Sequence, residues 1–483
     1  MAGGAVIAVL SVASEAAPLV KTGGLADVAG ALPGALRAHG VGMRTLLPGY
    51  PAVMAALEAP RICAEVPSCF GGPARVLRAR GGGLDLLVLD APHLFTRGAG
   101  IYLGETGADW PDNPERFAAL SWVAAEIAGG LIPDWRPALV HAHDWQGGLA
   151  PYYLARSTAA GKVASVLTIH NIAFQGLAPA SRLGSLRLDP ADFTPEGLEY
   201  WGQISALKAG LIWADRLTTV SPNYAEELLS PAFGMGLDGV LRARRGQLSG
   251  ILNGIDTQVW DPETDPLITP YKAAKGKAAN KAALRAEFGL PEAEGPLCIV
   301  ISRLTAQKGL DLLIEALPAL LERGGQLALL GSGDPGLEQA FQAAAAHPQV
   351  GVRIGYDEAL SHRMLAGGDA ILVPSRFEPC GLTQLYGLRY GTLPVVALTG
   401  GLADTVIPAS PATLAGKVVA TGVQFSPVTA AALGAALGRV CALYAQPKLW
   451  RAMMRNAMAH PVGWDHSAAA YAQLYRDILG EST

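Results

Sequence analysis

The residues best suited to chemistry are three cations that lie beside glycine turns or after predicted strands. Lys21 stands next to Gly23 and Gly24, and Arg303 and Lys308 follow a short apolar run in the second half of the chain. Open α/β sheets bind ligands beyond the carboxyl ends of their strands. Cations and glycine turns there suit a diphosphate, and each charge-assisted hydrogen bond contributes about 1.5–3 kcal/mol. The alternative is that these are ordinary surface cations.

The hexapeptide TGGLAD occurs twice, at residues 22–27 and 399–404, each time after a short apolar run. A chance repeat of six residues has a probability on the order of a per cent, so shared architecture explains it better. Paired glycines before a helix let the backbone approach an anion, which the helix N-terminus attracts. We therefore expect two similar halves, each with an anion-receptive turn. The alternative is a tight turn used twice for packing.

A carboxylate lies in a loop defined by Pro and Gly, within the segment SRFEPCGLT at residues 375–383. Glu378 precedes a predicted helix that begins at Thr383. In this position it is a candidate for recognising hydroxyl groups or for acid–base work. The alternative is that Glu378 caps the helix.

Two histidines share one face at the end of a predicted strand, where His141 and His143 are followed by Asp144 and Trp145. A metal site needs a third ligand, and none lies at metal spacing. His170 ends the next strand. Buried, hydrogen-bonded histidines are the common alternative, but two polar clusters beside an aromatic ring favour a wall that faces a sugar.

Several nucleotide motifs are absent or misplaced. The segment GSGDPG at residues 331–336 matches G-x-G-x-x-G, but it follows the second strand of its half, and Asp334 as N-cap with Pro335 at the first helical position explains it. There is no Walker A motif, no G-x-S-x-G elbow and no D-x-D pair. An enzyme acting on a nucleotide sugar would therefore neutralise the leaving diphosphate with side-chain cations and helix ends.

Short apolar runs alternate with helical patterns, which is typical of βαβ units and of two doubly wound parallel sheets. The segment 246–256 is Gly- and Asn-rich and is interpreted as a linker. The tail carries Tyr471, Leu474, Tyr475, Ile478 and Leu479 on one helical face, so we expect this face to pack on another element. Predicted strands cover 5–12, 84–89, 138–143, 163–170, 216–220, 297–301, 326–330, 350–354, 369–373 and 393–398, and predicted helices 311–321, 335–346 and 383–390.

Composition excludes several classes of protein. A chain of 483 residues is long enough for two large domains. The net charge of −4 makes nucleic acid a poor partner. The sequence has no apolar run of about 18 residues, so we expect no membrane span. It has no basic n-region, so we expect no secretory signal. The five cysteines are scattered without a C-x-x-C pair, which fits a reducing cytoplasm.

Six motifs taken together resemble the bacterial glycogen synthases and the plastid starch synthases. They are KTGGL at 21–25, HAHDW at 141–145, TIHN at 168–171, NGID at 253–256, SRLTAQK at 302–308 and FEPCGLTQ at 377–384. The resemblance implies the GT-B arrangement of two Rossmann-like domains facing across a cleft. It implies an acceptor-side domain at 1–245, a hinge at 246–256, a nucleotide-sugar domain at 257–460 and a helix at 461–483 that crosses back to the first domain.

The resemblance also implies transfer of glucose from ADP-glucose to the non-reducing-end 4-hydroxyl of an α-1,4-glucan, with retention and with neither metal nor other cofactor. Its motifs assign Lys21, Gly24, Arg303, Lys308 and the amides of Leu382 and Thr383 to the diphosphate, with Gly23, Cys380 and Gly381 in the same donor turns. They assign Glu378 to glucose hydroxyls, His170 and Asn253 to the transferred sugar, Asp144 and Trp145 to sugar and acceptor, and Tyr356 to adenine.

Two positions depart from the family pattern. Gln146 stands where some relatives have another His, and Leu398 precedes the second TGGLAD where relatives often carry a basic residue. The second departure favours packing for that copy. Rival interpretations are a transferase that makes sucrose or another small glycoside, a non-catalytic sensor of nucleotide sugar or glucan, and a dinucleotide oxidoreductase resting on GSGDPG alone.

Overall fold

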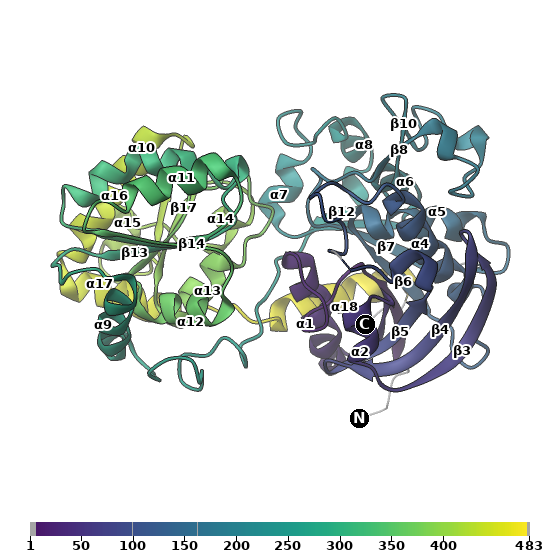
Figure 1. The fold of residues 1–483 in the computed structure, drawn as a ribbon, viewed down its shortest axis with the longest axis horizontal. Helices are drawn as coiled ribbons and strands as arrows, with labels where there is room; N and C mark the ends of the chain where they lie inside the picture. Colours follow the sequence, from purple (N-terminus) through teal and green to yellow (C-terminus); the bar gives the residue numbers. More distant parts are fainter. Residues whose placement is uncertain (1–5, 99, 162, 481–483) are drawn as a thin grey trace. The chain divides into compact units, whose positions relative to one another are not determined.

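The computed structural model describes residues 6–98, 100–161 and 163–480, and the chain divides into two compact units (Figure 1). Unit 1 comprises Met1–Asn253 and Trp464–Thr483, and unit 2 comprises Gly254–Gly463. Residue 5, the first of the strand predicted at 5–12, lies outside the described residues. Within those residues, no helix is both long and apolar enough to cross a bilayer.

The described part of unit 1 is built on a nine-stranded sheet in the order β12-β11-β7-β6-β1-β2-β5-β4-β3. The strands from β12 to β5 are parallel, and β5, β4 and β3 form an antiparallel extension. The bounds are β1 Ile7–Val12, β2 Val41–Pro48, β3 Glu58–Cys69, β4 Gly72–Gly81, β5 Leu84–Asp90, β6 Leu139–His143, β7 Ala164–Ile169, β11 Arg216–Thr219 and β12 Leu248–Gly250.

Helices lie on both faces of this sheet, because the central parallel strands are buried on both sides (Figure 1). A small antiparallel sheet, in the order β8-β10-β9, belongs to the same unit. The bounds are α1 Gly24–Leu36, α2 Pro51–Ala55, α3 Pro92–Phe95, α4 Asn113–Ala128, α5 Asp144–Arg156, α6 Ala206–Trp213, α7 Pro222–Glu227, α8 Asp238–Ala243, β8 Leu177–Pro179, β9 Glu199–Tyr200 and β10 Gln203–Ser205.

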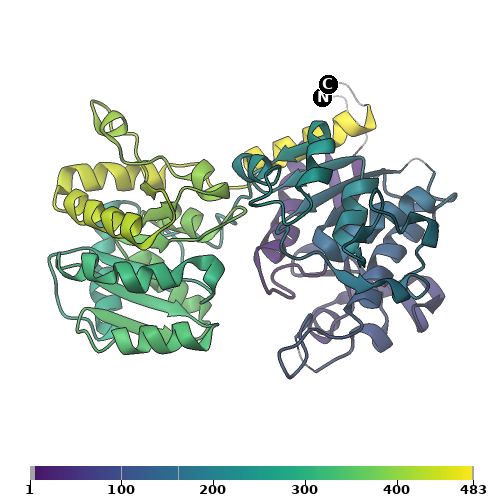
Figure 2. The same cartoon turned by 90° about the horizontal axis from the view of Figure 1, so that it is seen from above.

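The tail helix α18 (Asp465–Leu479) packs on α1 within unit 1. Tyr471 and Tyr475 are fully buried, and Leu474, Ile478 and Leu479 are partly buried against the same apolar cluster, which includes residues of β1 and β2. The yellow end of the chain therefore lies with the purple and blue unit (Figure 2). The apolar face predicted from the sequence is confirmed.

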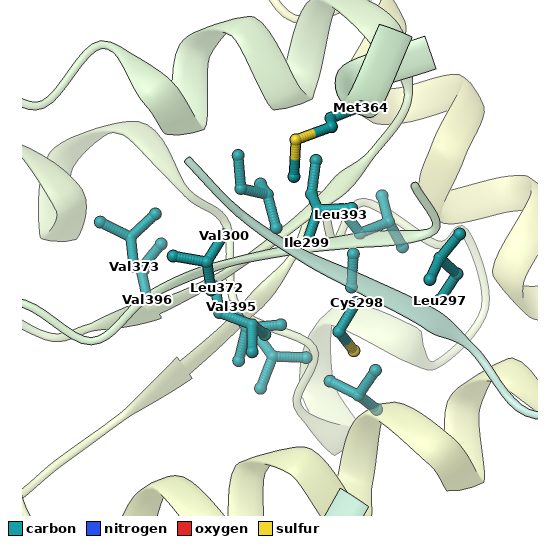
Figure 3. Packing of buried hydrophobic residues seen from close by; sticks show 14 of the residues in the cluster. Leu297, Cys298, Ile299, Val300, Met364, Leu372, Val373, Leu393, Val395 and Val396 are labelled. Carbon is teal, nitrogen blue, oxygen red and sulfur yellow. The ribbon is translucent and has the colours of Figure 1, made fainter. Parts of the chain in front are cut away.

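Unit 2 is built on a six-stranded, fully parallel sheet in the order β15-β14-β13-β16-β17-β18. Its central strands are almost continuously apolar, and Figure 3 shows Ile299 and Val300 of β13 among side chains of β16, β17 and Met364. The bounds are β13 Leu297–Ile301, β14 Gln326–Gly331, β15 Val350–Ile354, β16 Ala370–Val373, β17 Leu393–Ala397 and β18 Val423–Phe425.

Helices cover both faces of this second sheet, as a doubly wound fold requires (Figure 1). Both halves therefore have the predicted Rossmann-like fold. The bounds are α9 Lys277–Phe288, α10 Leu310–Leu321, α11 Pro335–Ala344, α12 Glu358–Gly367, α13 Thr383–Tyr390, α14 Gly400–Thr405, α15 Pro411–Leu414, α16 Ala430–Tyr444 and α17 Pro447–Met458.

The segment 246–256 is not wholly a linker. Leu248–Gly250 is the strand β12, which pairs in parallel with β11 at the edge of the first sheet. The compact units instead separate at Asn253 and again at Gly463. A strand of three residues, of which one is apolar, carries too little pattern to be recognised in a Gly-rich segment.

Candidate active site

A buried ion pair joins two loops of unit 2. The Lys308 ammonium lies 2.6 Å from a carboxylate oxygen of Glu378, and Ser375 donates a hydrogen bond of 2.8 Å to the same oxygen. Glu378 is 7% exposed. The loops follow β13 and β16, which are adjacent parallel strands, so their carboxyl ends deliver the two residues to one place.

Contacts along the same loops hold this pair in place. Arg376 makes two hydrogen bonds, of 2.7 and 2.6 Å, to the carboxylate of Asp311, and Gln307 donates to the carbonyl of Phe377 at 3.2 Å. Gly309 has a φ of +64°, and a Cβ there would lie 3.0 Å from the carbonyl carbon of Pro374. The backbone therefore approaches too closely for any other residue.

The idea that Glu378 caps the following helix is wrong. Helix α13 has Leu382 as its N-cap, without a side-chain cap. Its preceding turn contains Gly381 at a φ of +72°, and the side-chain amide of Gln384 donates to the carbonyls of Cys380 and Gly381, both at 3.0 Å. The N-terminus at Leu382 and Thr383 thus presents main-chain amides and a partial positive charge beside the Lys308–Glu378 pair.

Arg303 and Tyr356 are exposed at the ends of β13 and β15. Within the described residues, the guanidinium of Arg303 has no hydrogen bond or ion pair. Tyr356 is 76% exposed, and its hydroxyl donates to Glu358 at 2.6 Å. One exposed cation and one exposed ring thus lie just beyond the carboxyl ends of two strands of this sheet.

The GSGDPG segment has the structural explanation that the sequence favoured. Asp334 is the N-cap of α11 and accepts a hydrogen bond from the amide of Leu337 at 3.0 Å, and Pro335 is the first helical residue. Gly331 and Gly333 approach the main chain of residues 302–304. These glycines therefore serve close packing.

The two TGGLAD copies are used differently. In the second, the amide of Gly401 donates to the carbonyls of Glu378 and Pro379, both at 3.1 Å, and Gly400 has a φ of +44°. In the first, Gly23 is extended at a φ of −159°, and an added Cβ would meet no atom within 4 Å. The second copy packs against the loop that carries Glu378. In the first copy, the position that a Cβ would take at Gly23, the residue just before α1, is open space. Leu398, before the second copy, is half exposed.

Glu15 was not predicted from the sequence, and it supports the first glycine turn through Thr22. Its buried carboxylate accepts hydrogen bonds from the amide of Thr22 at 2.5 Å and from the Thr22 hydroxyl, and the hydroxyl of Tyr102 lies 3.4 Å away. Burial raises the pKa of Glu15, and the hydrogen bonds from Thr22 oppose that shift. Lys21 points to Asp27 at 2.8 Å on the partly exposed side of the turn.

The histidines form a buried array at the ends of β6 and β7. His143 Nδ1 lies 3.0 Å from His170 Nε2, and His143 Nε2 lies 3.2 Å from the hydroxyl of Ser11. His141 is held by Tyr475 at 2.8 Å and by Thr168 at 2.6 Å. Burial lowers the pKa of His143 to about 3 and those of His141 and His170 well below the usual value, so all three rings are neutral.

All ring nitrogens of His141 and His143 are thus hydrogen bonded to protein groups. His141 is therefore a buried, hydrogen-bonded core histidine, which is the alternative that the sequence left open. In the described part of the chain, no three His, Cys, Asp or Glu side chains gather as metal ligands would.

Asp144 begins α5 with a φ of +49°, an uncommon backbone conformation for this residue type. Its buried carboxylate accepts hydrogen bonds from the amides of His170 at 2.6 Å and Asn171 at 3.2 Å. Burial raises its pKa to about 7, against the effect of those two amides. Strained backbone and buried carboxylates are both enriched at functional sites, so the role predicted for Asp144 stays a prediction with two supporting observations.

Trp145, Gln146 and Asn253 are half-buried or buried within unit 1. Trp145 is half-buried, with its ring edge-on to Phe117 at 5.0 Å between centroids. Gln146 and Asn253 are buried, and their side-chain carbonyl oxygens have no hydrogen-bond partner among the described residues. The roles of Trp145 in acceptor contact and of Asn253 beside a sugar stay predictions.

Each unit therefore carries polar groups at the carboxyl ends of a doubly wound parallel sheet: buried carboxylates and histidines in unit 1, and cations with a helix N-terminus in unit 2. Open α/β sheets bind ligands at these strand ends, so each unit has the organisation of a ligand-binding Rossmann-like domain. The family model for the starch synthase catalytic domain matches residues 8–243, and the model for group 1 glycosyl transferases matches residues 281–457.

Known proteins are similar over the whole chain. A glycogen synthase from Paracoccus denitrificans is 66% identical over 97% of this chain and 98% of its own length. The catalytic domain of starch synthase IV from Arabidopsis thaliana, solved with ADP and acarbose, has a TM-score of 0.88 and 32% identity and covers 99% of this chain and 100% of the solved one. A sucrose-phosphate synthase from Thermosynechococcus elongatus, at 19% identity and a TM-score of 0.60 over 99% and 100%, shares the fold.

The chain belongs to the glycogen and starch synthase family. It is therefore a glycosyltransferase with two Rossmann-like domains, as the sequence motifs indicated.

Proposed function

We propose that the protein transfers glucose from ADP-glucose to the non-reducing-end 4-hydroxyl of an α-1,4-glucan, with retention of configuration and without a metal ion. The observation that carries this proposal is the Lys308–Glu378 pair beside the uncapped N-terminus of α13, with exposed Arg303 nearby in the sequence. Support for the nucleotide and the glucan comes from the starch synthase of the same fold, which was solved with ADP and with acarbose. The five free thiols support a reducing cytoplasm as the compartment.

In the proposed reaction, the bond between glucose C1 and the diphosphate oxygen breaks while C1 bonds to the acceptor 4-oxygen on the same face. The proton of the 4-hydroxyl moves to the departing phosphate oxygen. Arg303, Lys308 and the amides of Leu382 and Thr383 stabilise the charge that grows on the diphosphate. Lys21 adds a cation from unit 1.

Glu378 binds glucose hydroxyls in this scheme and is not the nucleophile of a double displacement. Lys308 and Ser375 both contact one oxygen of its carboxylate, which leaves the other oxygen to accept hydrogen bonds from glucose hydroxyls. A glucosyl adduct on Glu378, detected by mass spectrometry of trapped enzyme, would exclude this front-face scheme.

The test is a coupled assay of the full chain with glycogen and either ADP-glucose or UDP-glucose. It follows release of nucleoside diphosphate and extension of the glucan, with and without EDTA. We expect release with extension from ADP-glucose, unaffected by EDTA. Turnover with a small acceptor and none with glucan would favour the sucrose-type rival, and binding without turnover would favour a sensor.

A further inference from the structure

His143 lies behind His170 in the buried array, and the proposed reaction uses none of its atoms. Its side chain is 1% exposed, so it cannot reach a substrate directly. Its two ring nitrogens are both used, Nδ1 toward His170 at 3.0 Å and Nε2 toward Ser11 at 3.2 Å. It is therefore the middle member of a hydrogen-bonded row that ends at His170.

The ring plane of His143 is also fixed from the side. His141 lies against it with ring centroids 4.3 Å apart and an angle of 38° between the planes. His141 is itself hydrogen bonded to Tyr475 of α18 and to Thr168 of β7. His143 thus has little freedom to turn away from His170.

The single N–H of each neutral ring links the proton position on His143 to that on His170. A neutral imidazole has one N–H, so one ring nitrogen donates and the other accepts. The bond from His143 therefore determines whether His170 Nε2 donates or accepts, and with it the state of His170 Nδ1. The described residues give His170 Nδ1 no hydrogen bond, so this nitrogen is the one left for a ligand.

We propose that His143 is a positioning residue, which orients the ring of His170 and sets which of its nitrogens carries the proton offered to the transferred sugar. This inference rests on the proposed function, in which His170 contacts that sugar. Ser11 completes the row at its far end.

Two substitutions separate positioning from simple filling of space. The amide of Asn reaches about as far as Nδ1 of His, whereas the amide of Gln reaches about as far as Nε2. His143→Asn therefore keeps a partner for His170, and His143→Gln keeps a partner for Ser11 only. We expect kcat/KM for glucan extension to fall at least about tenfold in His143→Gln and to stay within about threefold in His143→Asn. Filling of space predicts the opposite order, because Gln is closer to His in volume.

Stability is the control for these variants. Ser11→Ala removes the outer bond while leaving the His143–His170 bond, and we expect a smaller loss of kcat/KM than in His143→Gln. The melting temperatures of the three variants should lie within a few degrees of one another. Equal activity losses in His143→Asn and His143→Gln would overturn the proposal.

A measurement that does not depend on turnover is ¹⁵N NMR of the full chain labelled at its nine histidines. Neutral rings give separate signals for the nitrogen that carries a proton and the one that does not. We expect the His170 signals, assigned with His170→Gln, to shift in His143→Gln and to change little in His143→Asn. Unchanged His170 signals in His143→Gln would refute the positioning role. If wild-type protein extended no glucan with either donor, the proposed function would fail while the NMR result still decided the hydrogen bond.

Discussion

The equivalent glycines of the two TGGLAD copies give a matched pair of substitutions. Gly400→Ala introduces a Cβ 2.9 Å from the carbonyl carbon of Glu378 and closer still to its oxygen, at a φ of +44°. Gly23→Ala introduces the same atom where the backbone is extended and nothing lies within 4 Å. The same change in the same hexapeptide therefore meets opposite surroundings.

The expected cost of Gly400→Ala has two parts. The left-handed backbone costs a residue with a Cβ about 1–2 kcal/mol, and the forced shift of packed main chain costs about 1–3 kcal/mol. The free energy of unfolding of unit 2 should fall by about 2–5 kcal/mol. For a domain of about 200 residues this lowers the melting temperature by about 5–15 °C. Gly23→Ala should leave the free energy of unfolding within about 0.5 kcal/mol of wild type.

Scanning calorimetry of the full-length variants measures both effects, and the coupled assay measures the consequence for the site. Because the new Cβ displaces the main chain of Glu378, we expect Gly400→Ala to lose about tenfold or more in kcat. If Gly400→Ala melted with wild type, or if Gly23→Ala melted as low as Gly400→Ala, the assignment of the second copy to packing would be refuted.

Four further outcomes are expected. Asp144 binds a proton more tightly when folded, because burial raises its pKa from 3.8 to about 7. Its contribution to stability is therefore present at acidic pH and is lost as the pH rises through about 7. Asp144→Asn, which keeps the acceptor oxygen, should gain about 2–3 kcal/mol over wild type between pH 5 and pH 8 in urea unfolding. Arg303→Ala should lower kcat about a hundredfold without loss of melting temperature, since its side chain makes no described contact, and full turnover would exclude its role. Lys308→Ala should lower kcat similarly and also cost about 3–5 kcal/mol of stability, because it leaves a buried carboxylate unpaired; unchanged urea unfolding would contradict this. Tyr356→Ala should raise the KM for ADP-glucose about tenfold while Tyr356→Phe stays near wild type, and equal values in steady-state kinetics would remove the stacking role.

The sequence predicted the second sheet more completely than the first. Strands β13 and β15 have the predicted bounds. β13 is a continuous apolar run, as buried parallel strands are, whereas β15 lies at the edge of the sheet and is exposed toward its end. The hairpin of β3 and β4 was missed, since it lies at a sheet edge where charged residues alternate with apolar ones and its register shifts along its length. The spacing of apolar residues along the sequence cannot distinguish such strands from polar loops.

Part of the site could be predicted from the residue types that follow the strands. Contacts made by the backbone leave no signal in the sequence and could not be predicted. The nearness of Lys308 and Glu378 could be predicted, because adjacent parallel strands end at one edge. The role of Glu15 could not, because its partner is the amide of Thr22, which every residue but Pro has. The only signal was a carboxylate just after β1 and before the glycine turn.

The return of α18 to unit 1 also sets an order of events during synthesis. Unit 2 is one continuous stretch, Gly254–Gly463, and all of its strands are synthesised before the helix that buries Tyr471 and Tyr475 against unit 1. At about 5–20 residues per second, the sheet of unit 1 waits on the order of ten seconds or more with that surface uncovered. The domain that is begun first is thus the last to be completed, and a nascent chain stalled before Trp464 exposes an apolar face that the finished protein never shows.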